Sequence, residues 1–184
     1  MNDLLVRVRR TPDRLLHPLR RRKAVTALRA RPRPTMLLVV CHGNICRSPL
    51  AAELLSRAVA PLGITVRSAG LIGFNRPAPA EALAAAEGHR VSLSDHRSAL
   101  ITAQLARGAD LIIVMDPTQR RYICERFGRR RADVVLLGDF DPAPVQTRTI
   151  RDPVDQRREV FDDVYARIAR CVREFAATLA TARR

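Results

Sequence analysis

The amino-acid sequence predicts a three-layer α/β protein, in which helices flank a four-stranded parallel sheet. From residue 36 onward, short apolar runs alternate with amphipathic segments of helical length. This alternation is typical of βαβ units, which make the sheet parallel and place helices on both of its faces. The chain has 184 residues, 47% of them apolar, which is enough for one such domain. Parallel sheets of this kind bind ligands beyond the carboxyl ends of their strands.

Four segments have the patterns of strands. The first is MLLVV at residues 36–40, a continuous apolar run of the kind that a strand buried on both faces requires. The remaining three strands are predicted at residues 64–70, 109–115 and 132–138.

Helices are predicted between and after these strands. The clearest spans residues 48–63, where Ser48 suits the N-cap, Pro49 suits the first turn and Gly63 lies past the end. Further helices are predicted at residues 77–88, 96–108 and 155–184.

The N-terminal segment differs from the rest of the chain in charge. Residues 1–34 hold 11 of the 33 basic residues, only two acidic residues and four prolines. We therefore predict a disordered basic extension over residues 1–35, outside a domain at residues 36–184. A short amphipathic helix around Leu15 to Leu28 is the alternative, and a translation start at Met36 also stays open. Such an arm could touch an anionic membrane, and no nucleic acid is expected as a partner, although charge alone does not choose.

The cysteines and apolar runs bear on the compartment. No apolar run reaches the length of a membrane helix, and no apolar stretch typical of a secretory signal follows the basic N-terminus. We therefore expect a cytoplasmic protein, whose thiols stay reduced. Its four cysteines are then expected to be free: Cys41, Cys46, Cys124 and Cys171.

The segment CHGNICRSP, residues 41–49, follows the first predicted strand. A loop of this length can curl so that its backbone N–H groups form an anion-binding nest, closed by the N-terminus of the next helix. Gly43 and Asn44 tolerate the left-handed backbone that such a loop needs. The sequence therefore predicts a phosphate-binding loop, formed by His42, Gly43, Asn44, Ile45, Cys46 and Ser48.

The residues at the two ends of this loop predict its chemistry. The positive field of the loop favours the thiolate form of Cys41, which would act as a nucleophile. The planar fork of Arg47 binds two phosphate oxygens, and Ser48 can donate a hydrogen bond to the sulfur. Structural zinc would need a second cysteine pair, a thioredoxin motif has two intervening residues, and the phosphate loop of nucleotide hydrolases needs a lysine. We expect neither a metal nor a cofactor.

Residues 36–184 resemble the low-molecular-weight protein tyrosine phosphatases. The segments VCHGNICRSPLAAELL, VRSAGL, LSDHRSALIT, ADLIIVMD and RDPVD carry the resemblance, in the order of that family. The resemblance implies metal-free hydrolysis of phosphotyrosine through a cysteinyl-phosphate intermediate. It also implies a tyrosine-phosphorylated protein as substrate, for which a bacterial tyrosine kinase is one candidate, and phosphate or other oxyanions as ligands.

Cleavage of a phosphoester by a thiolate also needs an acid for the leaving oxygen. Asp-Pro occurs at Asp116, Asp141 and Asp152. The residues alone leave Asp116 and Asp152 as close alternatives, and the resemblance implies Asp152 as the catalytic acid beside Cys41 and Arg47. Many family members have an aromatic residue where this chain has Val154. The wall for the substrate ring is then expected to be shallower, or to be supplied by Phe74, Phe140 or Tyr122.

Cys46 lies in the same loop as Cys41 and is expected to act as its redox partner. A disulfide between them would protect an oxidised nucleophile from further oxidation. His96 and Arg97 are expected to brace the loop, as the resemblance also suggests.

Three other functions stay open. Arsenate reductases share this loop but need a further cysteine pair, and Cys124 and Cys171 are far apart in the sequence. Protein arginine phosphatases usually carry threonine in place of Ile45. A basic protein that binds nucleic acid or membrane, with an inactive domain, is the third. The oligomeric state cannot be read from the sequence.

Overall fold

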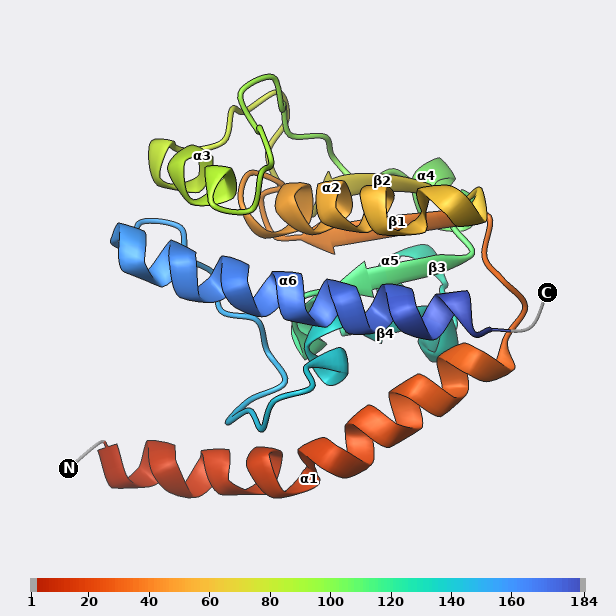
Figure 1. Ribbon diagram of the computed structural model, residues 1–184, viewed down its shortest axis with the longest axis vertical. Coiled ribbons are helices and arrows are strands. Elements are labelled where there is room, and N and C mark those ends of the chain that lie inside the picture. Colours follow the sequence, from red (N-terminus) through yellow and green to blue (C-terminus); the bar gives the residue numbers. More distant parts are fainter. Residues whose placement is uncertain (1–2, 183–184) are drawn as a thin grey trace.

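The computed structural model describes residues 3–182, with side chains from residue 13 onward. Its centre is a four-stranded parallel sheet with the strand order β2-β1-β3-β4 (Figure 1). The predicted fold class is confirmed. The strands are β1 (Met36–Cys41), β2 (Thr65–Gly70), β3 (Leu111–Val114) and β4 (Val134–Leu136).

Both faces of the sheet are covered by helices. On one face, Leu37 and Val39 of β1 pack with α2, α3 and α6, while on the other Leu38 and Val40 pack with α4 and α5 (Figure 1). This burial of consecutive residues explains why MLLVV is apolar without alternation. The helices are α1 (Asp3–Ala30), α2 (Arg47–Val59), α3 (Ala80–Glu87), α4 (Ala103–Gly108), α5 (Pro117–Phe127) and α6 (Arg158–Ala180), with short 3₁₀ turns η1 (Ala60–Leu62), η2 (Arg131–Asp133) and η3 (Leu137–Phe140).

The helix predicted at residues 96–108 is wrong in its first half, because only α4 is helical. Before it, Leu100 forms a parallel bridge with Gly70 at the end of β2. Gly70 N–H donates to the Ala99 carbonyl at 2.8 Å, and Ile101 N–H donates to the Gly70 carbonyl at 2.9 Å. These tertiary hydrogen bonds hold the segment in an extended conformation, against its helical pattern.

Helix α5 was not predicted, because its polar and arginine-rich sequence lacks an apolar stripe. Its ends nevertheless carry the expected signals. The Asp116 side chain accepts a hydrogen bond from Gln119 N–H as N-cap, Pro117 opens the first turn and Gly128 ends the helix in a left-handed conformation. The predicted strand 132–138 is also shorter than expected, since 3₁₀ turns flank β4.

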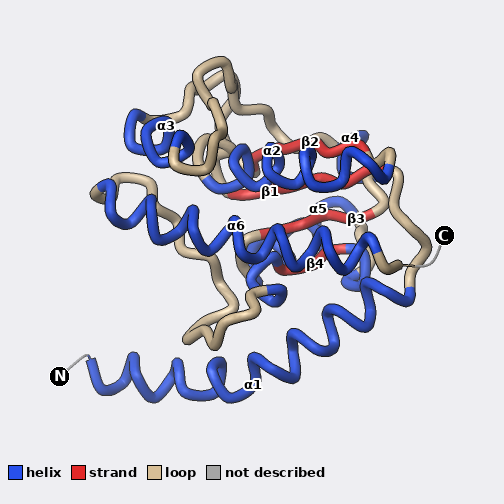
Figure 2. Tube along the Cα trace, in the orientation of Figure 1, coloured by secondary structure: helices blue, strands red, loops and turns tan. Residues whose placement is uncertain are grey.

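Residues 3–30 form helix α1, where disorder was expected and a shorter helix was the alternative. The helix is held by its contacts with the rest of the protein. Leu28 is buried, the His17 Nε2 atom lies 2.9 Å from the Asp141 carbonyl oxygen, and Arg21 pairs with Glu174 of α6. Tertiary packing of this kind stabilises helices more than intrinsic propensity does. Figure 2 shows the loop between η3 and α6 beside α1.

The predicted phosphate-binding loop lies at the carboxyl end of β1, one of the two central strands of the sheet. Across residues 3–182, none of the helices combines the length and the apolar character needed to cross a membrane.

Candidate active site

The predicted phosphate-binding loop runs from Cys41, the last residue of β1, to Arg47, the first residue of α2. Asn44 has a φ of 51°, the left-handed conformation that the sequence predicted within this loop. The loop therefore curls directly into the N-terminus of α2. The partial positive charge of that helix end favours an anion beside it.

Two hydrogen-bond donors face the sulfur of Cys41. Asn44 N–H donates to Cys41 Sγ at 3.2 Å, and Ser48 Oγ lies 3.0 Å from the same sulfur. The Asn44 Nδ2 group donates to Ser48 Oγ at 2.9 Å, so the serine hydroxyl hydrogen is left for one of two acceptors, Cys41 Sγ at 3.0 Å or the Ala69 carbonyl at 3.5 Å.

Asn44 is fully buried and fixes the shape of the loop through both its side chain and its backbone. Its Oδ1 atom accepts a hydrogen bond from Ala99 N–H at 2.9 Å, and its Nδ2 group also donates to Ser68 Oγ at 3.0 Å. His96 Nε2 lies 2.7 Å from the Asn44 carbonyl oxygen, in the bracing position expected for it. Arg97, by contrast, donates only to carbonyl groups of its own turn.

Gly70, at the end of β2, was missed by the sequence analysis. A Cβ atom at this position would lie 2.9 Å from the Gly43 carbonyl carbon and 3.0 Å from the Asn44 nitrogen. Only glycine lets β2 approach the backbone of the phosphate-binding loop so closely. A glycine that ends a strand next to the predicted site was the signal available in the sequence.

Arg47 connects the loop to the segment that contains Asp152. The Arg47 guanidinium is almost fully buried, donates to the Ile150 carbonyl at 3.1 Å through Nη1, and forms an ion pair with the Asp152 carboxylate through Nη2. Among the described residues, no acceptor lies within hydrogen-bond distance of the buried Nε atom. That N–H group is therefore available to an oxyanion held by the loop.

The structure separates the three Asp-Pro aspartates. Asp152 is 38% exposed in its side chain and faces Arg47. Asp116 lies on the same cavity but serves as the N-cap of α5. Asp141 is fully buried between Arg167 and Arg170, which identifies it as part of the packing between η3 and α6.

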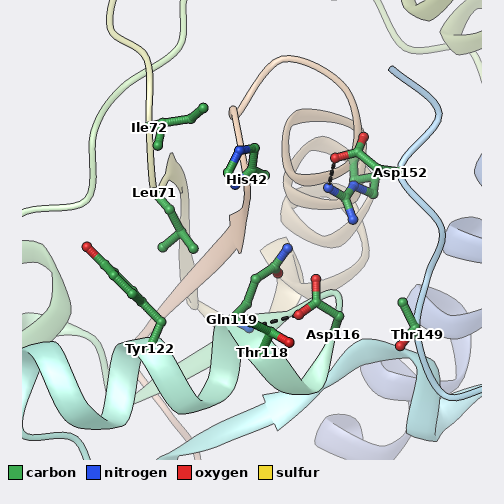
Figure 3. Close-up of a pocket in the computed structure, with 10 residues that line it drawn as sticks. His42, Leu71, Ile72, Asp116, Thr118, Gln119, Tyr122, Thr149 and Asp152 are labelled. Atoms are coloured by element: carbon green, nitrogen blue, oxygen red, sulfur yellow. Dashed lines mark hydrogen bonds and ion pairs between the residues drawn. The ribbon is translucent and has the colours of Figure 1, made fainter. Parts of the chain in front are cut away.

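A cavity of about 500 Å³ opens above Arg47. Figure 3 shows that its lining divides into an apolar side and a polar side, with the ion pair of Asp152 drawn as a dashed line. The apolar side is formed by Leu71, Ile72 and Tyr122, and the polar side by Asp116, Thr149 and Asp152.

Of the three aromatic residues expected to wall the substrate ring, Tyr122 lines this cavity. Phe140 is fully buried and packs edge-to-face on Phe175, at a centroid distance of 4.9 Å. Phe74 is 74% exposed and does not line the cavity. An aromatic side chain therefore reaches the site from α5 instead of from the position of Val154.

A second, smaller cavity of about 170 Å³ adjoins the loop, and Cys41, Cys46, Asp152 and Val154 are among its lining residues. Burial raises the pKa of the Cys46 thiol well above its ordinary value, and the neighbouring Cys41 adds to this shift. Cys46 is therefore a neutral thiol at neutral pH. All four cysteines are free in the structure.

The geometry defines the class of protein: a parallel α/β fold in which a loop leads from a cysteine at the end of a central strand to an arginine that is paired with an aspartate. The sequence model of the Low molecular weight phosphotyrosine protein phosphatase family matches residues 36–184, and the chain belongs to this family.

Known members resemble the chain closely. Low molecular weight protein-tyrosine-phosphatase Wzb of Salmonella typhi is 38% identical over 144 residues, which cover 78% of this chain and 93% of the relative. The crystal structure of the tyrosine phosphatase Wzb from Escherichia coli K30 in complex with sulphate superposes with a TM-score of 0.72 at 31% identity, covering 79% and 99% of the two chains. The YwlE arginine phosphatase from Geobacillus stearothermophilus has a TM-score of 0.71 at 27% identity, covering 80% and 94%.

Proposed function

We propose that the protein hydrolyses phosphotyrosine in proteins through a cysteinyl-phosphate intermediate, with Cys41 as nucleophile, Arg47 as phosphate ligand and Asp152 as acid and base. The observation that carries this proposal is the position of Arg47. It lies at the N-terminus of α2 beside the loop of Cys41, and it pairs with Asp152. This arrangement supports the proposal, because the proposed cation is next to the proposed acid and in the loop of the proposed nucleophile.

In the first step, the Cys41 thiolate attacks phosphorus and forms an S–P bond while the P–O bond to tyrosine breaks. The loop N–H groups and Arg47 hold the non-bridging oxygens, where negative charge is greatest. The substrate phosphate displaces Asp152 from the Arg47 fork. The released carboxylate takes up a proton from solvent and then donates it to the phenolate oxygen.

In the second step, a water molecule attacks phosphorus and Asp152 takes one of its protons. The S–P bond breaks, phosphate leaves and Cys41 returns to the thiolate. Ser48 and Asn44 stabilise this thiolate as a leaving group through the two hydrogen bonds described above.

The lining of the large cavity supports an aromatic substrate. Tyr122, Leu71 and Ile72 offer apolar surface beside the loop, and a phenyl ring can pack against the tyrosine at the distances typical of aromatic pairs. Phosphoarginine is the second candidate substrate, because an arginine phosphatase superposes well on this chain. The apolar side chain of Ile45, within the loop, favours phosphotyrosine.

The test is a comparison of turnover by the full chain on a phosphotyrosine peptide, a phosphoarginine peptide and p-nitrophenyl phosphate, with a chelator present. We expect the phosphotyrosine peptide to be the best peptide substrate. Cys41→Ser is expected to lower turnover by about 10⁴-fold or more. Unchanged turnover in Cys41→Ser would exclude the mechanism, and a preference for phosphoarginine would replace the proposed substrate.

Asp152 is tested against a matched aspartate in the same cavity. Asp152→Ala is expected to lower kcat by about 10² to 10⁴-fold, the usual contribution of a general acid. It should also leave a phosphoenzyme that can be trapped with acid and detected by mass spectrometry. Asp116→Asn keeps turnover within about threefold, since its side chain caps α5. The reverse pattern would assign the acid to Asp116.

The physiological setting follows from the same chemistry. A reactive thiolate is maintained where thiols stay reduced, so we place the protein in the cytoplasm. A tyrosine-phosphorylated protein is then its substrate, and a bacterial tyrosine kinase is the candidate to test first by dephosphorylation in vitro.

A further inference from the structure

We propose that the outer face of α1, defined by Leu15, Leu16, Leu19, Arg22 and Lys23, docks on an anionic membrane surface. The three leucines are 74%, 43% and 55% exposed, which places them among the most exposed large apolar side chains of the described residues. They lie within a single stretch of α1, so they form one patch.

Helix geometry separates this patch from the side of α1 that packs on the domain. At 3.6 residues per turn, Leu15, Leu19 and Arg22 follow one another along the helix. Arg22 lies at the edge of this face, where it is exposed and also borders a cavity lined by Glu174 and Thr178 of α6. His17 and Leu28, which are buried against the domain, lie on the opposite side. The leucines therefore cannot pack on their own domain while α1 keeps these contacts.

The charges around the leucines have one sign. Arg14, Arg22, Lys23 and Arg29 are exposed, and the only acidic residue between residues 13 and 30 is Asp13, which is paired with Arg20. A helix with exposed apolar residues flanked by basic ones is suited to the boundary between lipid headgroups and acyl chains. There, leucine enters the apolar layer and lysine or arginine contacts anionic headgroups.

Two other occupants fit this face less well. A second copy of the chain would bring Arg22 and Lys23 against the same cations, and like charges repel. Nucleic acid would pair with the cations through its phosphates but would leave the leucines in water. A membrane uses both the charge and the apolar surface. Among the described side chains of α1, residues 13–30, none lines the large cavity, so docking through this face would leave that cavity open.

The experiment is sedimentation of the full chain with vesicles at near-physiological salt. One set of vesicles contains phosphatidylcholine and phosphatidylglycerol in a ratio of about three to one, and the other contains phosphatidylcholine alone. We expect binding to the anionic vesicles at least roughly tenfold tighter than to the neutral ones. Leu15→Ser/Leu19→Ser and Arg22→Ser/Lys23→Ser should each weaken that binding by roughly tenfold.

A matched control removes two exposed arginines elsewhere, in Arg107→Ser/Arg126→Ser. This control should bind vesicles within about twofold of the original chain, and thermal melting should show that all variants are folded. If the control loses as much vesicle binding as the α1 variants, then net charge alone explains the binding, and the proposal is overturned.

Absence of vesicle binding by the full chain would also overturn it. So would a dimer in sedimentation velocity that Leu15→Ser/Leu19→Ser dissociates, because the face would then be an interface between copies. Binding to duplex DNA that is insensitive to the leucine substitutions, without vesicle binding, would overturn it in favour of nucleic acid. The four substituted residues of α1 do not line the large cavity, so turnover of p-nitrophenyl phosphate tests the proposed function separately.

Discussion

In the proposed mechanism, two donors stabilise the Cys41 thiolate, the Asn44 N–H group and the Ser48 hydroxyl. Ser48→Ala removes one of them and leaves Asn44 Nδ2 with only Ser68 as acceptor. A hydrogen bond to a charged group contributes about 1.5–3 kcal/mol. We therefore expect Ser48→Ala to lower kcat by about ten- to a hundredfold on p-nitrophenyl phosphate, with a smaller effect on KM.

Ser48→Thr provides the control for this prediction, because it keeps the hydroxyl and should recover part of the activity. If Ser48→Thr loses as much of kcat as Ser48→Ala, the loss reflects a structural defect and contradicts the role assigned to the hydroxyl.

Cys46 is predicted to protect Cys41 from irreversible oxidation. Peroxide converts the Cys41 thiolate to a sulfenic acid, and the Cys46 thiol then displaces water to form a disulfide. Because burial raises the pKa of Cys46, few thiolates are available and the second reaction should be slow. We expect Cys46→Ser to recover several-fold less activity than the original chain after peroxide and then dithiothreitol. Cys124→Ser is the matched control. Equal recovery in all three proteins would show that Cys46 has no protective role.

At the residue scale, the sequence could predict what is local. Cys41, Arg47 and the loop between them were found because a strand, a glycine, an asparagine and a helix start follow one another directly. The contacts of Asn44 with Ala99 and His96 could not be predicted, because they depend on how distant segments pack. For the same reason, the residues alone could not choose between Asp116 and Asp152. The geometry shows one as a helix cap and the other beside Arg47.

At the scale of elements, the segment between β4 and α6 positions Asp152. It begins at Gly138, where a Cβ atom would lie only 2.1 Å from the Arg148 carbonyl oxygen. Gly138→Ala must displace that segment, and we expect a loss of about 1–3 kcal/mol in the free energy of unfolding, together with a lower kcat. Urea unfolding and turnover measure the two effects.

Gly108 offers the control for this substitution. It is the last residue of α4, and no heavy atom lies within 4 Å of a Cβ built there. Gly108→Ala should leave turnover unchanged and should be neutral or slightly stabilising. If both variants lose the same free energy of unfolding, then the close approach of the backbone at Gly138 adds no cost of its own.

Asp133, at the end of η2, links the C-terminal side of α1 to the sheet. The hydrogen bond from Arg130, with a second from Arg31, holds the pKa of its carboxyl below its ordinary value. A depressed pKa means that the unfolded chain binds the proton more readily. The contribution to stability is therefore present above the ordinary pKa of about 3.9 and is lost as pH falls through the folded value.

We therefore expect Asp133→Asn to lower the Tm by a few degrees at pH 7, and the difference from the original chain to shrink as pH falls below about 4. Thermal melting across this range measures it. A difference that is constant with pH would indicate that the aspartate acts through its shape and not through its charge.

Elements were predictable where the apolar pattern and the end signals agreed, as in β1 and α2. The pattern failed for residues 96–102, whose helical spacing is overridden by hydrogen bonds to Gly70. It also failed for α5, whose end signals were present without an apolar stripe. Both failures have the same cause. The conformation of each segment depends on contacts with distant parts of the chain, and these contacts cannot be read from the local sequence pattern.

On the scale of the whole molecule, the family match and the physical domain do not have the same boundary. The match begins at residue 36, but α1 precedes it and contributes Leu28 to the core. Composition alone suggested disorder for this basic segment. The side of the helix that faces the domain, however, makes a buried contact. His17 contacts the carbonyl group of Asp141, whose side chain is paired with Arg167. The helix is thus both part of the packing and a carrier of exposed charge.

Removal of residues 1–34 tests how far the two boundaries differ. The remaining chain contains the complete family match, so we expect it to fold and to keep kcat on p-nitrophenyl phosphate within about threefold. It should melt at a lower temperature, because loss of a buried leucine alone costs about 2–5 kcal/mol and the contact of His17 is lost as well.

Leu28→Ala in the full chain separates packing from the other effects of the truncation. It should lower the free energy of unfolding by about 2–3 kcal/mol and leave the outer face of α1, and hence vesicle binding, intact. Urea unfolding of the three proteins measures the comparison. If the truncated protein is as stable as the full chain and Leu28→Ala has no effect, then α1 does not pack on the domain in solution. The disorder expected from its composition would then be the better description of residues 1–35.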